Sequence, residues 1–175
     1  MKNFKLLEFD FDAGPLLEEL ADKEHLWNQN DIRTKGNSFH KEADDILLIF
    51  DIDEEDNKGC YPASGELEKL GDFVYNFLEH LGYTEDDAVL GRMVLTRLKP
   101  GKVIYPHIDL KDHTDAYNRY HLCLTDADSI FMCGDEVLNE LGGTAFWFDN
   151  SLMHSVQNKG DSDRIHLIVD IAKHD

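Results

Sequence analysis

Three side chains in the second half of the chain, His107, Asp109 and His154, have the chemical types and spacing to bind one divalent metal ion. His107 and Asp109 are separated by a single residue. In an extended segment residues i and i+2 point to the same side, so both can reach one ion. His154 must arrive from another segment. Two imidazoles and one carboxylate on one face of the ion form the ligand set of non-haem Fe(II) oxygenases, which leaves the opposite positions open. The three residues therefore predict a ferrous site.

The His-x-acid pattern is weak evidence by itself, because the chain has 9 histidines and 36 acidic residues. The same pattern recurs at His40-Lys41-Glu42 and at His113-Thr114-Asp115. The first is followed by more acidic residues, and the second lies in a predicted polar loop. Only His107 follows a Pro-Gly turn, Pro100-Gly101, and a short extended segment. Sequence context therefore favours His107 and Asp109 as the ligand pair.

His154 follows an apolar stretch, Phe146–Phe148, that breaks into the polar turn Asp149-Asn150. A strand that ends in this way can deliver a metal ligand at the mouth of a barrel. The alternative interpretation is a half-buried histidine within a hairpin. The sequence alone leaves both interpretations open.

Arg164 begins the last predicted strand, ten residues after His154. Strand alternation places it on one face with His166, Ile168 and Asp170. It is either an edge cation paired with a surface acid or a clamp for a carboxylate ligand, and one such charge-assisted contact contributes about 1.5–3 kcal/mol. In another predicted strand Arg119 and His121 share a face with Cys123, so both can point towards the metal.

Several elements must position these residues. Residues 4–11 predict a strand, and Pro15 suits the first turn of a helix whose face includes Leu16, Leu20 and Trp27. Ile46–Ile52 predicts a buried strand. The apolar stripe of residues 64–81 predicts a helix that is capped by Ser64 and ended by Gly82. Further strands are predicted at 88–98, 103–108, 117–125, 129–133, 144–148, 152–157 and 164–171.

Many short strands in succession predict a mainly β fold with flanking helices, a double-sheet jelly roll or barrel that the helices buttress from outside. The 175 residues suit a single domain, 1–175, in which residues 1–87 form a mixed α/β support and rim and residues 88–175 the jelly-roll core. We expect substrate specificity to lie in loops such as 53–62, 111–117 and 134–143.

The composition of the chain limits the classes of binding partner and the cellular compartment that we expect. The formal net charge of −19 repels phosphate backbones and anionic membranes, so we expect neither nucleic acid nor a membrane as partner. The acidic surface serves solubility or attracts a cationic substrate. Cys60, Cys123 and Cys133 lack zinc spacing and indicate reduced thiols, and neither a signal segment nor an apolar run of membrane-spanning length is evident. We therefore expect a cytoplasmic protein.

Residues 88–172 resemble the aspartyl/asparaginyl β-hydroxylase family of Fe(II)- and 2-oxoglutarate-dependent dioxygenases, including its proline cis-hydroxylase-like members. Arg33-Thr34 and Ser38-Phe39-His40 match more loosely. The animal β-hydroxylases have glycine where this chain has Asp109, and this difference weighs against an epidermal-growth-factor-domain substrate. The segments that carry the resemblance are Lys99-Pro100-Gly101, Pro106–Asp109, Arg119–Leu122, Phe148–Ser151, His154 and Arg164–Asp170.

The resemblance implies a cupin-like double-stranded β-helix in which His107, Asp109 and His154 hold Fe(II). Arg164, with help from Thr96, would bind one end of 2-oxoglutarate, and Arg119 and His121 would line the pocket near this co-substrate. Arg33 and His40 are candidates for a substrate-facing rim. The reaction implied is hydroxylation, with dioxygen, of a C–H bond in a free amino acid or a peptidyl residue, releasing succinate and CO2. The alternatives are a jelly-roll zinc hydrolase or isomerase, or a non-catalytic binding module.

Overall fold

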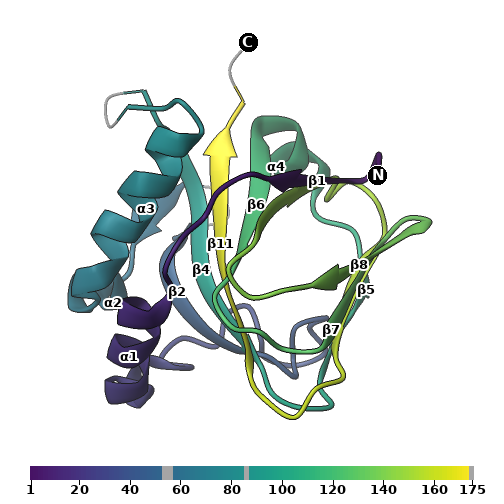
Figure 1. Ribbon diagram of the computed structural model, residues 1–175, viewed down its shortest axis with the longest axis horizontal. Coiled ribbons are helices and arrows are strands. Elements are labelled where there is room, and N and C mark those ends of the chain that lie inside the picture. Colours follow the sequence, from purple (N-terminus) through teal and green to yellow (C-terminus); the bar gives the residue numbers. More distant parts are fainter. Residues whose placement is uncertain (53–56, 85–86, 174–175) are drawn as a thin grey trace.

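The structure of the protein, a computed structural model, describes residues 1–52, 57–84 and 87–173. Within this part of the chain two antiparallel sheets face each other, and helices cover the outer face of the larger sheet (Figure 1). The larger sheet has the order β1-β9-β6-β11-β4-β2-β3 and the smaller one β5-β10-β7-β8. The strands are β1 (Phe4–Leu7), β2 (Asp44–Asp51), β3 (Lys58–Cys60), β4 (Leu90–Leu98), β5 (Val103–His107), β6 (Tyr117–Cys123), β7 (Ser129–Cys133), β8 (Glu136–Glu140), β9 (Ala145–Phe148), β10 (His154–Asn158) and β11 (Arg164–Ala172).

The predicted jelly roll is confirmed, and so are the strands predicted after residue 87, within a few residues at their ends. One strand was missed, because β8 occupies residues that the sequence assigned to the loop 134–143. It forms a hairpin with β7, in which Cys133 pairs with Glu136 across the two-residue turn Gly134-Asp135. Gly134 has a φ of 57°, which glycine adopts without strain. A Gly-Asp pair between alternating residues was therefore a hairpin signal.

The N-terminal predictions need two corrections. The first strand, β1, ends at Leu7 instead of residue 11, and Phe9 and Phe11 pack instead on α3 (Glu68–His80), with ring centroids 5.4 Å from Phe77 and 5.1 Å from Phe73 respectively. The first helix, α1 (Gly14–Asp22), buries Leu16 and Leu20 but ends before Trp27. A short 3-10 turn, Glu24–Leu26, separates Trp27 from it.

The helix predicted at 64–81 is two helices, α2 (Pro62–Glu66) and α3, with a break at Leu67. Ser64 does not cap α3, since it lies inside α2 and its hydroxyl donates to the carbonyl of Tyr61. The C-terminal prediction is confirmed: Gly82 has a φ of 86°, and the amide of Tyr83 donates to the carbonyl of Leu78.

The core has two parts, which the alternation along the central strand β11 explains. Its odd-numbered residues, among them Leu167 and Val169, pack with the helices on the outer face of the larger sheet. Its even-numbered residues, among them Arg164 and Ile168, face the space between the sheets. That space also holds an aromatic cluster of Phe4, Phe131, Phe146 and Phe148. The predicted faces of this strand are confirmed, and polar side chains are thereby delivered into the interior.

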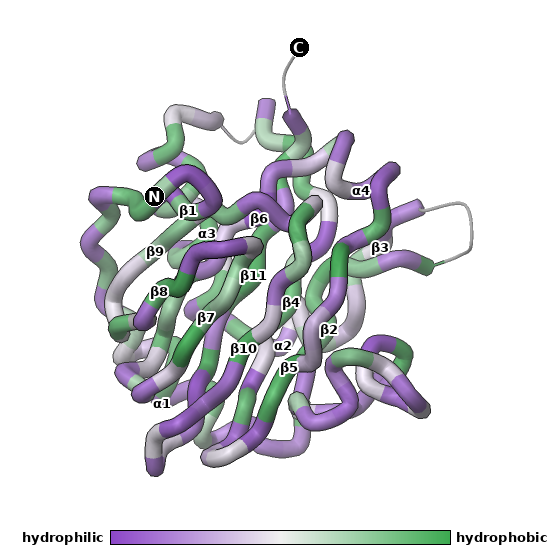
Figure 2. The backbone as a smooth tube through the Cα atoms, turned by 90° about the vertical axis from the view of Figure 1, so that its right-hand side faces the viewer, coloured by the Kyte–Doolittle hydropathy of each residue, from purple (hydrophilic) through white to green (hydrophobic). Residues whose placement is uncertain are grey.

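Figure 2 looks onto the smaller sheet, with β8, β7, β10 and β5 in front of the larger one. The polar loop predicted at 111–117 is largely a short helix, α4 (Lys111–Ala116), which leads into β6. His113 lies on this helix and is 2% exposed, so the prediction that it lies in a polar loop is wrong. None of the helices in the described part of the chain is long and apolar enough to cross a membrane.

Candidate metal centre

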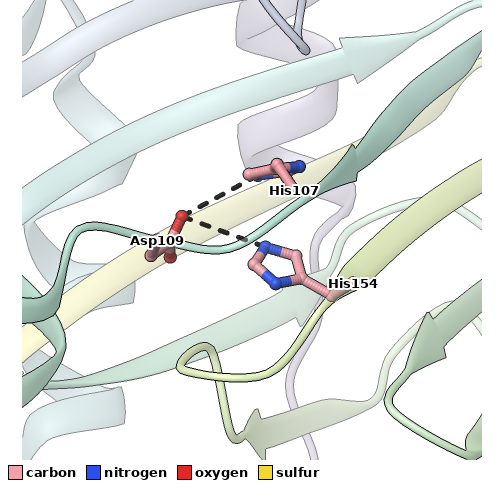
Figure 3. A group of neighbouring side chains, drawn as sticks. All are labelled: His107, Asp109 and His154. Atoms are coloured by element: carbon pink, nitrogen blue, oxygen red, sulfur yellow. Dashed lines mark ion pairs between the residues drawn. The ribbon is translucent and has the colours of Figure 1, made fainter.

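The smaller sheet brings the two predicted histidine ligands together. His107 ends β5, His154 begins β10, and the two residues are directly paired across these antiparallel strands. Their ring centroids are 4.2 Å apart. Asp109 follows β5 and is fixed by its backbone amide, which donates to the carbonyl of Asn150 at 3.2 Å. One ligand atom from each of the three residues lies within 4.8 Å of the others (Figure 3).

Both imidazoles are oriented by backbone carbonyl groups. Nδ1 of His107 lies 2.7 Å from the carbonyl oxygen of Tyr105, and Nδ1 of His154 lies 2.9 Å from that of Leu152. Because a carbonyl only accepts, Nδ1 carries the proton in each ring, and the lone pair is on Nε2. The two Nε2 atoms lie 3.7 and 3.9 Å from Oδ1 of Asp109. Outer hydrogen bonds of this kind are what metal-binding histidines use to fix their tautomer.

The two oxygens of Asp109 have different surroundings. Oδ2 accepts hydrogen bonds from Nη1 of Arg119 at 2.6 Å and from Nδ2 of Asn150 at 2.8 Å. Oδ1 is the atom that faces the two histidines. The carboxylate is thereby held with one oxygen available for a metal, and the three donor atoms fit a facial 2-His-1-carboxylate site.

The protonation states suit metal binding. Burial lowers the pKa of His154 to about 4 and also lowers that of His107, although the Asp109 carboxylate opposes both shifts. Burial by itself would raise the pKa of Asp109, but Arg119 and His154 lower it to about 2. At neutral pH the imidazoles are therefore neutral and the carboxylate is ionised, which are the forms that bind a metal ion.

A cavity next to the triad contains the other predicted site residues. Arg164 is 1% exposed on the central strand β11, which excludes the alternative of an edge cation paired with a surface acid. His121 stacks on Phe146 at 5.3 Å. The hydroxyl of Thr96 donates to Oδ1 of Asp45 at 2.8 Å. The cavity is lined by Arg33, His40, Thr96, Ile104, His107, Arg119, His121, Phe131, Phe148, His154, Val156, Arg164 and Ile168.

The segment 33–40, whose sequence resembles the family only loosely, contributes Arg33 and His40 to the cavity wall. The amide of Tyr105 on β5 donates to the carbonyl of Phe39 at 2.9 Å, so the segment lies along the strand that carries His107. The Phe39 ring stacks on His107 at 5.3 Å with an interplanar angle of 6°, and His40 meets the same ring edge-on at 4.7 Å.

Most described residues of the loops that were predicted to carry substrate specificity lie in strands or helices. Residues 136–140 form strand β8 and residues 111–116 form helix α4, so neither is a loop. Residues 53–56 lie outside the described part of the chain, and 58–60 and 62–66 are β3 and α2. Of the loosely matched N-terminal residues, Arg33 and His40 both line the cavity.

Two functional neighbours were missed by the sequence analysis. Asn150 binds Asp109, and Asp170 binds Arg119 from the next strand. The alternation of β11 offered a signal for Asp170, because it placed this acid on the same face as Arg164. No pattern in one sequence distinguished Asn150 from an ordinary turn residue.

Residues 65–174 match the family described as aspartyl/asparaginyl β-hydroxylase. Among curated protein sequences none matches the chain. Similar solved structures include a 2-oxoglutarate–Fe(II) oxygenase family protein from Burkholderia pseudomallei, with 17% identity, a TM-score of 0.62, and coverage of 99% of this chain and 85% of that one. Another is the viral collagen prolyl hydroxylase from Paramecium bursaria Chlorella virus-1, with 12% identity, a TM-score of 0.59, and coverage of 99% and 97%.

A third similar structure, a prolyl hydroxylase from Trichoplax adhaerens in complex with a peptide fragment, is 10% identical with a TM-score of 0.59 and covers 97% of this chain and 83% of that one. At these identities the likeness supports the fold, whereas the family match covers well over half of the chain and includes all three triad residues. The chain therefore belongs to the aspartyl/asparaginyl β-hydroxylase family and is an Fe(II)- and 2-oxoglutarate-dependent oxygenase.

Proposed function

We propose that this oxygenase hydroxylates a C–H bond of an amino acid, free or within a peptide, and that succinate and CO2 are the co-products. Nε2 of His107, Oδ1 of Asp109 and Nε2 of His154 would hold the iron. Fe(II) with 2-oxoglutarate and dioxygen supplies the oxidising power for such a reaction. The observation that carries this proposal is that these three donor atoms converge while the remaining polar atoms of each ligand are already hydrogen bonded.

The co-substrate site is proposed at Arg164. This guanidinium is buried in the cavity that also contains His107 and His154. A planar guanidinium matches a carboxylate with two parallel hydrogen bonds, so it suits the distal carboxylate of 2-oxoglutarate. Thr96 and His121 line the same cavity and would complete the co-substrate pocket. The apolar side chains of Ile104, Val156 and Ile168 would exclude water from it.

The substrate side of the cavity is proposed at Arg33 and His40. Nη1 of Arg33 is held by Oδ2 of Asp45 at 2.6 Å and contacts the hydroxyl of Thr96 at 3.1 Å. Within the described part of the chain, Nε and Nη2 of Arg33 have no hydrogen-bond partner, although the side chain is only 11% exposed. These two groups can donate hydrogen bonds to the carboxylate of an amino acid or of an acidic peptide. His40 would contact the same substrate from the neighbouring turn.

A succinate-release assay across amino acids and short peptides, with Fe(II), ascorbate and dioxygen, tests the proposal. We expect succinate only when Fe(II) and 2-oxoglutarate are both present, and a hydroxylated product with the true substrate. Asp109→Ala or His154→Ala should abolish turnover. The matched control is Asp115→Ala, which removes the acid of the second His-x-acid pattern, an exposed residue paired with Lys111, and should retain full activity.

Turnover that survived both triad substitutions would rule out the proposed iron site. Failure of calorimetry to detect 2-oxoglutarate binding to the metal-loaded protein would remove the co-substrate from this cavity. The family match favours the oxygenase over a zinc hydrolase, an isomerase or a non-catalytic binding module. Iron content after anaerobic purification provides an independent check.

A further inference from the structure

A continuous set of buried charged contacts runs from Asp109 to helix α4, away from the cavity. Arg119 donates to Oδ2 of Asp109 through Nη1 at 2.6 Å. The same guanidinium donates to Asp170 through Nε at 2.8 Å and Nη2 at 2.7 Å. Nε2 of His113 lies 2.7 Å from Oδ2 of Asp170. The four side chains thus form one hydrogen-bonded series from α4 to the metal centre.

The sheet register fixes the middle of this series. Arg119 on β6 and Asp170 on β11 are directly paired across neighbouring antiparallel strands of the larger sheet. Asp109 instead follows β5, a strand of the smaller sheet. Arg119 therefore joins a carboxylate of one sheet to a carboxylate belonging to the other, at the point where the metal ligand must be held.

Asp170 determines which nitrogens of Arg119 face the metal ligand. A guanidinium has five N–H groups in a rigid plane, and Asp170 occupies the edge formed by Nε and Nη2. Only Nη1 is then directed at Asp109, and it binds a single oxygen, Oδ2. If that edge were released, Arg119 could turn and bind both oxygens of Asp109, which would compete with a metal for Oδ1.

We propose that Asp170, supported by His113, is a positioning residue for Asp109 that acts through Arg119. The inference rests on the proposed iron site, and it changes the role of Arg119. The sequence resemblance assigns this arginine to the co-substrate pocket, whereas its guanidinium forms ion pairs with the two carboxylates. Asp170 is fully buried and has no place in the cavity lining, so its effect on the metal must pass through Arg119.

His113 completes the arrangement from the opposite side. It is 2% exposed, and its ring stacks on Tyr117 at 4.7 Å. Nε2 lies against the carboxylate of Asp170, and because a carboxylate oxygen only accepts, the N–H at Nε2 donates there. Its Nδ1 is buried and is without a hydrogen-bond partner within the described residues. The histidine therefore contributes a single directed hydrogen bond, which holds Oδ2 of Asp170 against Arg119.

The test is metal binding by the full chain in the absence of 2-oxoglutarate, with Co(II) as a spectroscopic substitute for Fe(II). We expect Asp170→Asn to weaken Co(II) binding about 10- to 100-fold, the usual effect of losing an outer partner of a metal ligand. The visible spectrum of the saturated variant should also change, because Asp109 would bind the ion differently. His113→Phe should shift both quantities in the same direction by a smaller factor.

Asp44→Asn is the matched control. Oδ2 of Asp44 accepts from Nε of Arg97 at 3.1 Å and from Nη2 of Arg97 at 2.8 Å. Asp44 therefore occupies the same Nε–Nη2 edge of its arginine that Asp170 occupies on Arg119, although it does so through one oxygen instead of two. Arg97 lies against Trp27 on the helix side of the larger sheet, away from the triad. Asp44→Asn should lower the melting temperature and leave the Co(II) affinity and spectrum unchanged.

The outcomes separate this inference from the proposed function. If Asp109→Ala binds Co(II) with the wild-type affinity, the proposed iron site is incorrect and the proposed function fails with it. If Asp109→Ala loses Co(II) while folded Asp170→Asn binds it with the wild-type affinity and spectrum, Asp170 is only structural and the inference fails alone. Should Asp170→Asn not fold, His113→Phe and Arg119→Lys decide: a wild-type Co(II) spectrum in both would overturn the inference.

Discussion

At the residue scale, the metal site depends on the hydrogen bonds made by those polar atoms of the triad side chains that do not face the metal position. The Nδ1 atoms of the two histidines are committed to carbonyl groups and Oδ2 of Asp109 to Arg119 and Asn150, so one donor atom on each side chain remains for the metal. The three metal ligands are therefore preorganised in the absence of the ion. Preorganisation reduces the cost of ordering side chains on binding.

Arg164 carries the first prediction at this scale. Arg164→Lys keeps the positive charge but loses the two parallel N–H groups that match a carboxylate. We expect the KM for 2-oxoglutarate to rise about tenfold to a hundredfold, corresponding to roughly 1.5–3 kcal/mol for a charge-assisted contact, while Co(II) affinity without co-substrate stays at the wild-type value. Steady-state succinate release at varied 2-oxoglutarate measures the first quantity. An unchanged KM would remove this arginine from the co-substrate site.

The sequence indicated His107, Asp109 and His154 because strand periodicity places the first two on one side and because, of the His-x-acid patterns, only this one follows a Pro-Gly turn and an extended segment. It also placed Arg119 and Arg164 on inward faces, since alternation is a local property. Asn150 and the pairing of Asp170 with Arg119 escaped it. Those contacts depend on which strands become neighbours, and strand order is set by long-range packing that no local pattern encodes.

At the element scale, the segment 33–40 lies against the triad without belonging to the jelly-roll sheets. Its backbone docks on β5 through the Phe39 carbonyl, and the Phe39 ring covers His107. The sequence pattern of this segment contains no apolar periodicity, so its docking could not be read from the chain. We propose that it contributes to the shape of the substrate entrance.

Phe39→Ala tests that position. The side chain is 51% exposed, so its loss should change the free energy of unfolding by less than about 1 kcal/mol. Turnover should fall severalfold, because the ring that stacks on His107 and supports its orientation is gone. Tyr75→Ala, which removes a comparably exposed aromatic ring on α3, should leave turnover unchanged. Equal turnover in Phe39→Ala and wild type would show that the segment does not serve the site.

The secondary-structure elements also differ in how well the local sequence pattern predicts them. The even spacing of strands after residue 87 and the Pro-Gly and Gly-Asp turns indicated the jelly roll. The break at Leu67 and the helix α4 were not foreseen, because the apolar stripe continues through the first and the residues of the second are polar. In both places tertiary packing overrides local propensity. His113 on α4 shows this directly, since it is buried against Asp170.

At the scale of the whole molecule, the net charge of −19 coexists with a cavity lined by three arginines, Arg33, Arg119 and Arg164. The acidic exterior and cationic interior are compatible because the buried arginines are compensated locally, as Asp45 compensates Arg33 and Asp170 compensates Arg119. A cavity of this composition suits ligands that carry a carboxylate, such as dicarboxylates and amino acids.

The pH dependence of stability is a prediction for the whole fold of the metal-free protein. The pKa of His154 is lowered from 6.5 to about 4 by burial, so the unfolded chain binds this proton first and stability falls as pH drops from about 6.5 to 4. The pKa of Asp170, which burial would raise, is lowered to about 2 by Arg119, so its contribution persists above 3.8 and is lost as pH falls towards 2. On acidification the stability contributed by His154 is therefore lost first, and the stability contributed by Asp170 is lost at lower pH.

Urea unfolding at pH 7, 5 and 4 measures the first of these losses, which amounts to about 3 kcal/mol for the full shift of His154. His154→Gln removes this titrating ring and should reduce the decline between pH 6.5 and 4 by about that amount. The part of the decline due to His40, His107 and His166, whose pKa values burial also lowers, should remain. A decline of wild-type size in His154→Gln would mean that another group is responsible.

The central claim is tested most directly by a crystal structure of the protein grown without oxygen in the presence of Fe(II) and 2-oxoglutarate. We expect one iron ion bound by Nε2 of His107, Oδ1 of Asp109 and Nε2 of His154, with the distal carboxylate of 2-oxoglutarate on Arg164. An ion held by other residues, or 2-oxoglutarate bound away from the ion, would show that this triad is not the iron site of the oxygenase.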